Sequence, residues 1–196
     1  METVAVNTKT NPIVIGWSID RAYSEVAFNV KHLMVANVRG VFKEFDAEIY
    51  TNDGDFLGTE INFWLNPASV DTGDAERDNH LKSVDFFDCE NYKKIEFTSN
   101  SYQNVDNEGS YEFYGDLTIK GITKNIKLDV EVAGIMKDQL GNNKAAFTIN
   151  GKINRKDWGL NWNTLLDGGG VLLSDYVWIN CEIQLIKQSQ KSLYSL

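Results

Sequence analysis

Apolar and polar residues alternate along most of this chain, and this period of two limits the possible folds more than any other feature. In residues 25–30, for example, valine and phenylalanine occupy the even positions, while glutamate, alanine and asparagine occupy the odd ones. Such alternation is typical of β-strands that bury one face. Eight segments show it, at 26–30, 38–49, 61–65, 95–99, 111–119, 126–132, 147–153 and 177–185. With mostly short turns between them, they predict an antiparallel sheet wrapped around its apolar face.

An all-β chain of this kind has two solutions, an eight-stranded antiparallel barrel and a two-sheet sandwich. In the second segment the apolar parity changes between Phe42 and Phe45, which predicts a β-bulge at residues 43–44. Gly115 and Gly151 occupy inward positions, where we expect them to leave space. Because an eight-stranded barrel can hold one small ligand, these glycines favour a hollow interior.

One segment, residues 71–88, interrupts the series of strands and holds the densest cluster of charged and aromatic residues. Asp71 or Thr72 can cap a short helix that runs to Lys82, since both side chains accept hydrogen bonds from a first helical turn. The Phe-Phe pair at 86–87 would then press onto whatever the helix covers. We expect this helix to close one end of the barrel as a lid.

The chain has 196 residues, a length that fits one domain with a substantial core. We expect a flexible N-terminal arm at 1–15, a single barrel domain at 16–187 and a polar C-terminal tail at 188–196. The N-terminal stretch lacks the basic start and apolar run of a secretory signal, so a cytoplasmic location is expected, or a periplasmic one if a signal has been removed.

Charge and hydropathy exclude several kinds of partner. Nineteen basic and 28 acidic side chains give a formal charge of −9, which repels phosphate backbones and argues against nucleic acid. No window approaches the ~20 apolar residues of a membrane span, so no stable membrane insertion is expected. The two cysteines and two histidines, Cys89, Cys181, His32 and His80, show no metal-ligand spacing. We predict no metal site, no disulfide and no cofactor.

Six stretches, in order along the chain, carry a resemblance to a known family. They are W-S-I-D-R-A-Y-S-E-V-A-F-N-V-K-H-L at 17–33, G-V-F-K-E-F at 40–45, R-D-N-H-L-K-S-V-D-F-F-D at 77–88, I-E-F-T-S at 95–99, G-D-L-T-I-K-G-I-T-K at 115–124 and I-N-R-K-D-W-G-L at 153–160. Together they resemble the YceI-like family of lipocalin-like polyisoprenoid-binding proteins. The resemblance implies an eight-stranded antiparallel lipocalin-like barrel with a lidding helix. It also implies an elongated apolar cavity for an isoprenoid chain or similar amphiphile, a homodimer, and no catalytic activity.

The candidate ligand-binding residues follow from parity, from the lid and from the irregular segment at 155–176. Inward aromatics and the lid would hold the apolar tail of a quinone, polyprenyl, fatty acid or amide ligand, and a cation and a histidine would meet its polar head. The candidates are Phe28, Phe42, Phe63, Arg77, His80, Leu81, Phe86, Phe87, Phe97, Phe113, Phe147, Trp158 and Trp162. For any single aromatic residue, a plain core role is the alternative.

Two other functions stay open. The chain could be an enzyme acting on an isoprenoid lipid with His80 as general base, although Asp78 lies two positions away on the helix and does not face it. It could also be a non-binding structural or interaction module whose barrel is filled by side chains. The Gly168–Gly170 run lacks the context of a phosphate-binding loop and suggests a mobile flap or a dimer contact.

Three aromatic residues, Trp64, Tyr114 and Trp178, have outward parity, on the face that water should cover. If they cluster in the folded protein, they mark a protein–protein surface. Apart from the family resemblance, these three residues are the reason to expect a homodimer.

Overall fold

The computed structural model describes residues 14–33, 35–52, 56, 59–106, 108–164 and 172–188, and these form one antiparallel sheet with a short α-helix. The strands are β1 Val14–Ile19, β2 Glu25–His32, β3 Ala36–Phe42, β4 Phe45–Asn52, β5 Ile61–Leu65, β6 Val70–Asp71, β7 Ile95–Asn104, β8 Ser110–Ile119, β9 Ile122–Lys137, β10 Asn143–Asn154 and β11 Leu173–Lys187. The helices are α1 Ala75–Lys82 and three short 3-10 helices, η1 Arg21–Tyr23, η2 Pro67–Ser69 and η3 Arg155–Trp158.

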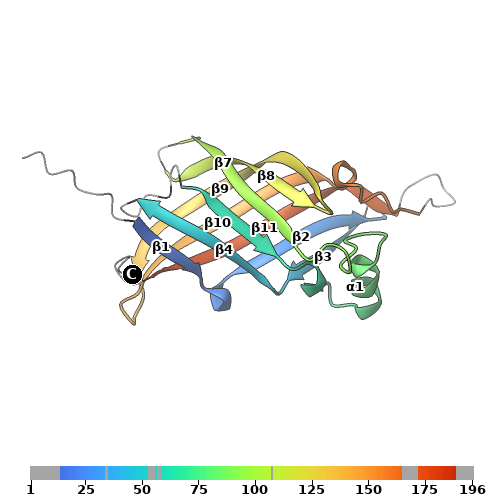
Figure 1. Cartoon of the computed structure of the whole chain (residues 1–196), viewed down its shortest axis with the longest axis horizontal. Helices are drawn as coiled ribbons and strands as arrows, with labels where there is room; N and C mark the ends of the chain where they lie inside the picture. The colour runs from blue at the N-terminus through green and yellow to red at the C-terminus, as the bar shows by residue number, and fades with distance from the viewer. Residues whose placement is uncertain are drawn as a thin grey trace, which may run out of the picture.

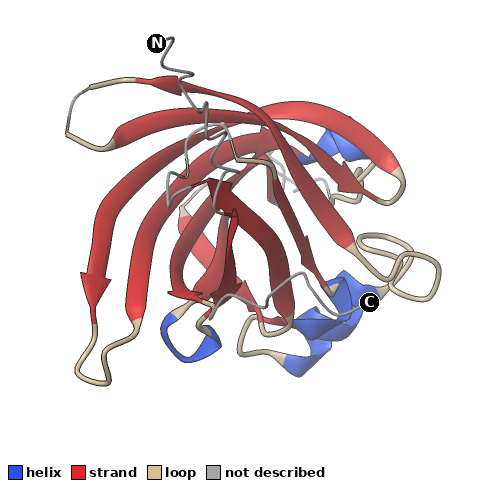
Figure 2. Cartoon of the chain, turned by 60° about the vertical axis from the view of Figure 1, so that its left-hand side comes forward, coloured by secondary structure: helices blue, strands red, loops and turns tan. Residues whose placement is uncertain are grey.

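The sheet closes into a barrel, as predicted, and the sandwich alternative is wrong. Strands β1, β4, β5 and β7 to β11 follow one another in the hydrogen-bonded order, and β1 also pairs with β11. The last strand makes this closure, since it pairs with β10 on one side and with both β2 and β1 on the other. The strands wrap around a common interior, and α1 lies at one end of the long axis, opposite β1 (Figures 1 and 2).

The barrel has eight strands, and three of them are interrupted, so that each of these three carries two strand labels. Strands β1 and β2 are separated by η1, β3 and β4 by residues 43–44, and β5 and β6 by η2. The parity change predicted at 43–44 is confirmed, because Phe42 and Phe45 are both buried on either side of the break. Strand β1 was not predicted and begins inside the expected arm, while residues 1–13 and 189–196 lie outside the described residues.

Strand β6 occupies the last place in the sheet order and pairs with β3. The chain then passes through α1 before it re-enters the sheet at β7, and this detour lies at the end of the barrel where α1 is drawn (Figure 1). We call α1 with the residues that follow it to position 88 the lid segment, and this end of the barrel the lid end.

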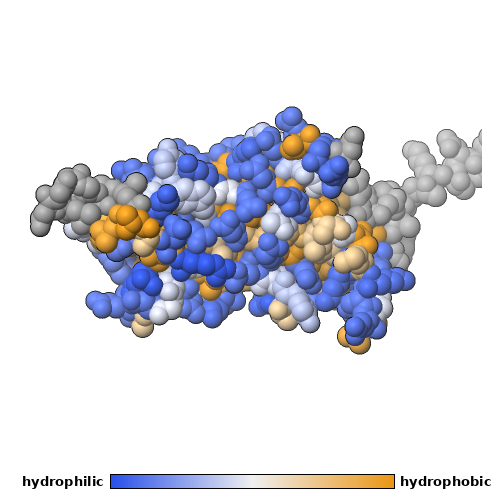
Figure 3. All heavy atoms as spheres, turned by 180° about the vertical axis from the view of Figure 1, so that it is seen from behind, coloured by the Kyte–Doolittle hydropathy of each residue, from blue (hydrophilic) through white to orange (hydrophobic). Residues whose placement is uncertain are grey.

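The two faces of the sheet differ as the alternation predicts. Inward side chains form one hydrophobic core, which includes Phe45, Phe97, Phe113 and Leu185. The face of the molecule seen in Figure 3 is mostly hydrophilic, with some hydrophobic areas between the polar side chains. Sheet closure therefore gathers the apolar positions of every barrel strand in one interior.

The inward glycines do not leave empty space, which corrects the expectation from sequence. A Cβ atom at Gly115 would clash with the Cζ and Cε2 atoms of the Phe97 ring and lie only 2.6 Å from the Thr98 carbonyl oxygen. A Cβ atom at Gly151 would lie 2.6 Å from Leu128 Cδ2. Side chains from the neighbouring strands therefore lie over both glycines, as aromatic residues often do over strand glycines.

Substitution of Gly115 tests this packing. Gly115→Ala should lower the free energy of unfolding by about 1–3 kcal/mol, because the backbone at Thr98 cannot yield as a flexible side chain can. Gly16→Ala in β1 is the matched control, since its nearest neighbour would be Tyr50 Cε1 at 3.7 Å, and it should stay within about 0.5 kcal/mol of wild type. Urea unfolding of the two variants measures both values, and equal effects would contradict this account.

Candidate functional site

The barrel encloses a cavity with a volume of about 250 Å³. Every barrel strand contributes to its wall. The six inward phenylalanines chosen from parity all line it, namely Phe28, Phe42, Phe63, Phe97, Phe113 and Phe147. Three residues of the lid segment, Leu81, Phe86 and Phe87, also line it. The structure thus brings nine of the predicted residues together around one space.

The chemistry of the wall is almost uniform. Apart from Arg155 and the thiol of Cys181, the described residues that line the cavity are aliphatic or aromatic. A water molecule in a cavity needs two to four polar partners, and an apolar cavity of this kind stays dry. The wall suits a hydrocarbon chain and offers almost no hydrogen-bond partners to a polar group.

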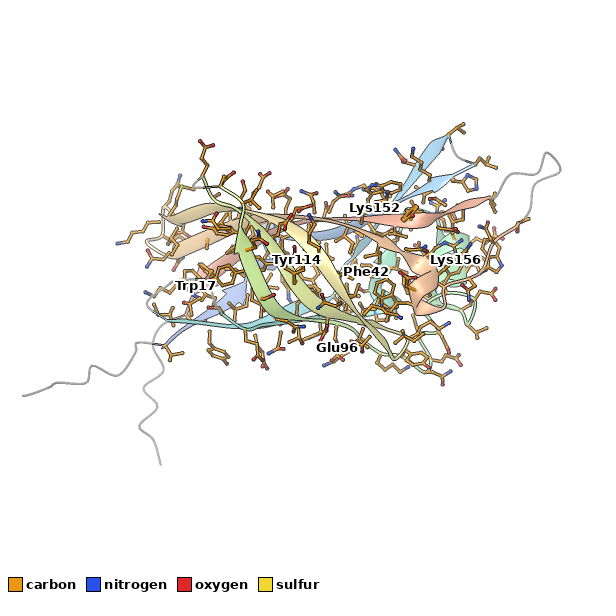
Figure 4. The ribbon with its side chains drawn as sticks, turned by 90° about the horizontal axis from the view of Figure 1, so that it is seen from above. Trp17, Phe42, Glu96, Tyr114, Lys152 and Lys156 are labelled. Carbon is orange, nitrogen blue, oxygen red and sulfur yellow. The ribbon has the colours of Figure 1, made fainter. Side chains whose placement is uncertain are left out.

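At the end of the barrel opposite the lid, aromatic rings close the cavity. The Trp17 ring lies 4.8 Å from the Phe56 ring, which in turn lies 5.0 Å from Phe147. Trp17 Nε1 donates to Thr51 Oγ1 at 2.9 Å, and both residues are buried. Figure 4 shows Trp17 and Phe42 at separate positions along the long axis of the barrel, with Phe42 nearer to the end that carries Lys156. Phe56 was missed from the sequence because it lies in none of the alternating segments.

The lid segment begins with a helix capped by Asp74, whose carboxylate accepts from the backbone N–H groups of Glu76 and Arg77 at 3.0 Å. This corrects the predicted cap at Asp71 or Thr72. The lid segment reaches the interior through its aromatic residues, and the Phe87 ring lies 5.7 Å from that of Phe42. Lys120 Nζ donates to the Val84 carbonyl at 3.1 Å and so ties the lid segment to the β8–β9 turn.

Arg77 does not line the cavity wall, although the sequence placed it at the head of the ligand. Its Nε donates to Thr72 Oγ1 at 2.7 Å and its Nη2 to the Thr72 carbonyl at 3.0 Å. Asp78 accepts from the Thr72 hydroxyl at 2.6 Å. These bonds fold the chain back onto the first turn of α1 and engage Nε and Nη2 of the guanidinium.

His80 also stays off the wall. Its Nε2 lies 3.0 Å from Asp85 Oδ2, so Asp85, and not Asp78, orients the ring. The ring packs edge-on against Phe86 and Trp162, with ring centres 5.1 and 4.6 Å apart. His80 therefore holds the lid segment against the segment that follows η3.

The two tryptophans expected at the site have supporting positions. Trp158 is 1% exposed and donates from Nε1 to the Leu117 carbonyl at 3.0 Å. Trp162 packs on His80 and Phe86. Neither residue lines the cavity wall, and the Gly168–Gly170 run lies outside the described residues.

Arg155 was not predicted from the sequence, and it is the one charged residue among the described residues that line the cavity. It is 2% exposed, and its Nε donates to the Ser174 carbonyl at 2.9 Å. Burial lowers the pKa of its guanidinium, while the nearby Asp175 carboxylate opposes that shift. A signal was present in the sequence: Arg155 continues the inward parity of 147–153, where a charge is unexpected.

The three outward aromatics do not gather in one patch. Trp64 lies on β5, Tyr114 on β8 and Trp178 on β11, and each has a local contact. Lys94 Nζ lies 4.8 Å from the Trp64 ring centre, Lys152 lies 5.5 Å from that of Trp178, and Tyr114 donates to Glu112 at 2.8 Å. The homodimer stays a prediction, without the support expected from these residues.

Other chemistry is sparse in the part of the chain that the structure describes. There, no group of three or more His, Cys, Asp or Glu residues is placed to hold a metal ion. Cys89 and Cys181 are free thiols. No helix in the described ranges is long and apolar enough to cross a membrane.

A closed antiparallel barrel around an apolar cavity defines the lipocalin-like class of β-barrel proteins. Comparison with known proteins narrows this class. A family model for the YceI-like domain matches residues 17–185. The chain therefore belongs to the YceI-like family.

Similar proteins agree with this assignment. A UPF0312 protein of Staphylococcus epidermidis is 38% identical over 162 residues, which cover 82% of this chain and 91% of that protein. The crystal structure of a Campylobacter jejuni YceI protein has a TM-score of 0.69 and 31% identity, and covers 96% of this chain and 99% of that one. A polyisoprenoid binding domain from Saccharophagus degradans has a TM-score of 0.59 over 89% of this chain and 99% of that one. At 13% identity, it shows the shared fold alone.

The cysteines provide a test of the dry interior. Burial raises the pKa of the Cys181 thiol to about 12 and also raises the pKa of the Cys89 thiol. Because the thiolate is the reactive form, neither cysteine should react with a disulfide reagent such as DTNB at about pH 8 in the folded protein, and both should react in urea. Rapid reaction of native Cys181, identified with a Cys89→Ser variant, would contradict a closed apolar wall.

Proposed function

We propose that this protein binds a long-chain amphiphilic lipid inside the barrel and sequesters or carries it without catalysis. The observation that carries this proposal is a cavity inside the barrel whose wall, among the described residues, is apolar apart from Arg155 and Cys181. Each buried methylene group contributes ~0.8 kcal/mol, so about 10–15 of them supply several kcal/mol net after the chain is ordered. Burial alone is therefore enough to hold such a ligand.

The ligand class that we favour is an isoprenoid, such as a quinone or a polyprenyl chain. The Saccharophagus degradans domain of the same fold is described as a polyisoprenoid binding domain, which supports this choice. A fatty acid or fatty amide has the same long apolar tail and suits the same wall. In each case the tail occupies the cavity and the polar head lies at the lid end.

The two alternatives have less support. A barrel filled by side chains would leave no cavity of this size. An enzyme with His80 as general base requires the imidazole to reach a bound lipid, whereas its ring packs edge-on against Phe86 and Trp162 and does not line the wall. Loss of turnover in His80→Ala with lipid binding intact would favour the enzyme.

The direct test is mass spectrometry of an organic extract of the purified protein, followed by uptake of an added isoprenoid quinone. We expect the extract to contain a lipid in amounts comparable to the protein, or the emptied protein to take up the quinone. Repeated absence of any lipid together with no quinone uptake would contradict the proposal.

A substitution that fills the cavity tests whether the lipid binds inside the barrel or on its outer surface. Ala47 lines the cavity from β4, and Tyr50 is exposed on the other face of the same strand. Ala47→Trp should lower the amount of bound lipid about tenfold or more, because an indole takes space that the tail needs. Tyr50→Trp adds an indole outside and should leave lipid uptake unchanged. Equal uptake by the two folded variants would show that the lipid lies elsewhere.

A further inference from the structure

The turn between β2 and β3 carries apolar residues, which is unusual for a hairpin turn. Val35 is 87% exposed there, and Leu33 is 42% exposed. Hairpin turns are normally built from Gly, Asn, Asp and other polar residues, as is the Lys120-Gly121 turn between β8 and β9. Exposed apolar residues at such a place indicate a contact with something outside the chain. We call Leu33 and Val35 the hairpin tip.

The backbone of Leu33 adds a second, independent observation. Its φ is +52°, in the left-handed region that Gly, Asn and Asp adopt more readily than leucine does. The turn is closed by a hydrogen bond from the Val35 N–H to the His32 carbonyl at 3.2 Å. Asparagine or glycine would suit the backbone at position 33 better. The leucine is therefore better explained by its exposed apolar side chain than by folding.

The hairpin tip lies at the lid end of the cavity. The Leu33 N–H donates to the Leu172 carbonyl at 2.8 Å. The next residue, Leu173, lines the cavity, as does Val30 of β2. Figure 1 shows β2 running toward the end of the barrel at which α1 lies. Whatever the hairpin tip contacts therefore meets the protein beside the end that the lid segment closes.

Aromatic and basic side chains lie behind the hairpin tip on the outer face of the sheet. Tyr176 is exposed on β11, and Lys152 Nζ lies 4.1 Å from its ring centre. Lys152 Nζ and Lys31 Nζ lie 5.5 and 6.0 Å from the ring centre of Trp178. Neither lysine forms an ion pair with a described residue. Tyrosine and tryptophan favour the boundary between water and lipid, and lysine reaches from it to phosphate groups.

We infer that the hairpin tip inserts reversibly into the surface of a lipid bilayer, with Lys31 and Lys152 facing anionic headgroups. Two apolar side chains bury too little surface for stable insertion, and the formal charge of −9 confines the contact to this end. The contact itself does not require the proposed function, but its use rests on that function. A barrel that touches a membrane with its lid end can exchange a water-insoluble chain without releasing it into water.

Co-sedimentation with sucrose-loaded vesicles of phosphatidylcholine and phosphatidylglycerol tests the inference. Wild type should bind, and Val35→Asp should lower the partition coefficient about tenfold, because a carboxylate replaces an apolar group at the hydrocarbon boundary. Leu140→Asp is the matched control and should bind as wild type does. Leu140 is also 87% exposed, but it lies in the β9–β10 turn, at the end of β9 away from the lid segment. Absence of wild-type binding, or an equal loss in both variants, overturns the inference.

Leu33→Asn separates membrane contact from an effect on folding. Because asparagine adopts a positive φ more readily than leucine, the urea midpoint of this variant should equal or exceed that of wild type. Its vesicle binding should nevertheless fall about fivefold, since an apolar side chain is lost from the hairpin tip. Vesicle binding equal to that of wild type would overturn the inference.

The double variant Lys31→Gln/Lys152→Gln tests the contact with headgroups. It should bind the mixed vesicles about tenfold more weakly than wild type, because each lysine near an anionic surface adds to the attraction. Vesicles of phosphatidylcholine alone should bind both proteins equally. Unchanged binding to the mixed vesicles overturns the role given to the two lysines.

A second copy of this chain is the rival occupant of the hairpin tip. Sedimentation velocity of wild type and Val35→Asp tests it in the absence of lipid. We expect the two proteins to have the same oligomeric state. If Val35→Asp separates a wild-type dimer into monomers, and wild type does not bind vesicles, the hairpin tip is an interface between copies and the inference is overturned.

Quinone uptake separates this inference from the proposed function. An isoprenoid quinone is offered either in the vesicles or as a cyclodextrin complex in solution. Val35→Asp should load from cyclodextrin as wild type does, and more slowly from vesicles. Equal rates from vesicles overturn the inference and leave the proposed function standing. If wild type loads from neither source, the proposed function fails, whereas vesicle binding that is lost in Val35→Asp would still support the membrane contact.

Discussion

Closure of the sheet through β11 is the interaction on which the rest of the structure depends. This strand runs from Leu173 to Lys187 and is long enough to pair with β2 near its start and with β1 near its end. Once the ring is closed, the inward side chains of every strand face one another across a single interior. Because those side chains are apolar, water gains no hydrogen bonds there, and space that they do not fill remains available to hydrocarbon.

The two ends of the barrel are built differently. At the β1 end, Trp17, Phe56 and Phe147 pack ring against ring, and a buried hydrogen bond from Trp17 to Thr51 fixes the indole. At the other end, the lid segment lies between β6 and β7 in the chain and is held by contacts such as those of His80 with Asp85 and Trp162. A plug of packed rings and a lid tied by polar contacts suit a cavity that is entered from the lid end.

The fold was readable from the sequence because a half-buried strand must alternate, and the inward phenylalanines could be chosen by parity for the same reason. The incorrect predictions concern residues whose surroundings depend on contacts between segments far apart in the sequence. Parity placed Gly115 on the inner face but could not show that the Phe97 ring covers it. Arg77 was chosen for its charge, yet two of its guanidinium nitrogens donate to Thr72 and the side chain stays off the cavity wall. Arg155 was missed because its burial depends on carbonyls at 160, 162 and 174, which no local pattern brings together.

The central claim is that the sheet encloses unfilled apolar space that a lipid chain occupies. A crystal structure of protein purified without any organic extraction tests it most directly. The claim predicts continuous tubular electron density inside the barrel, running from Phe56 toward the lid segment. Side chains packed across the centre, or a chain of ordered water molecules in place of the tube, would contradict it.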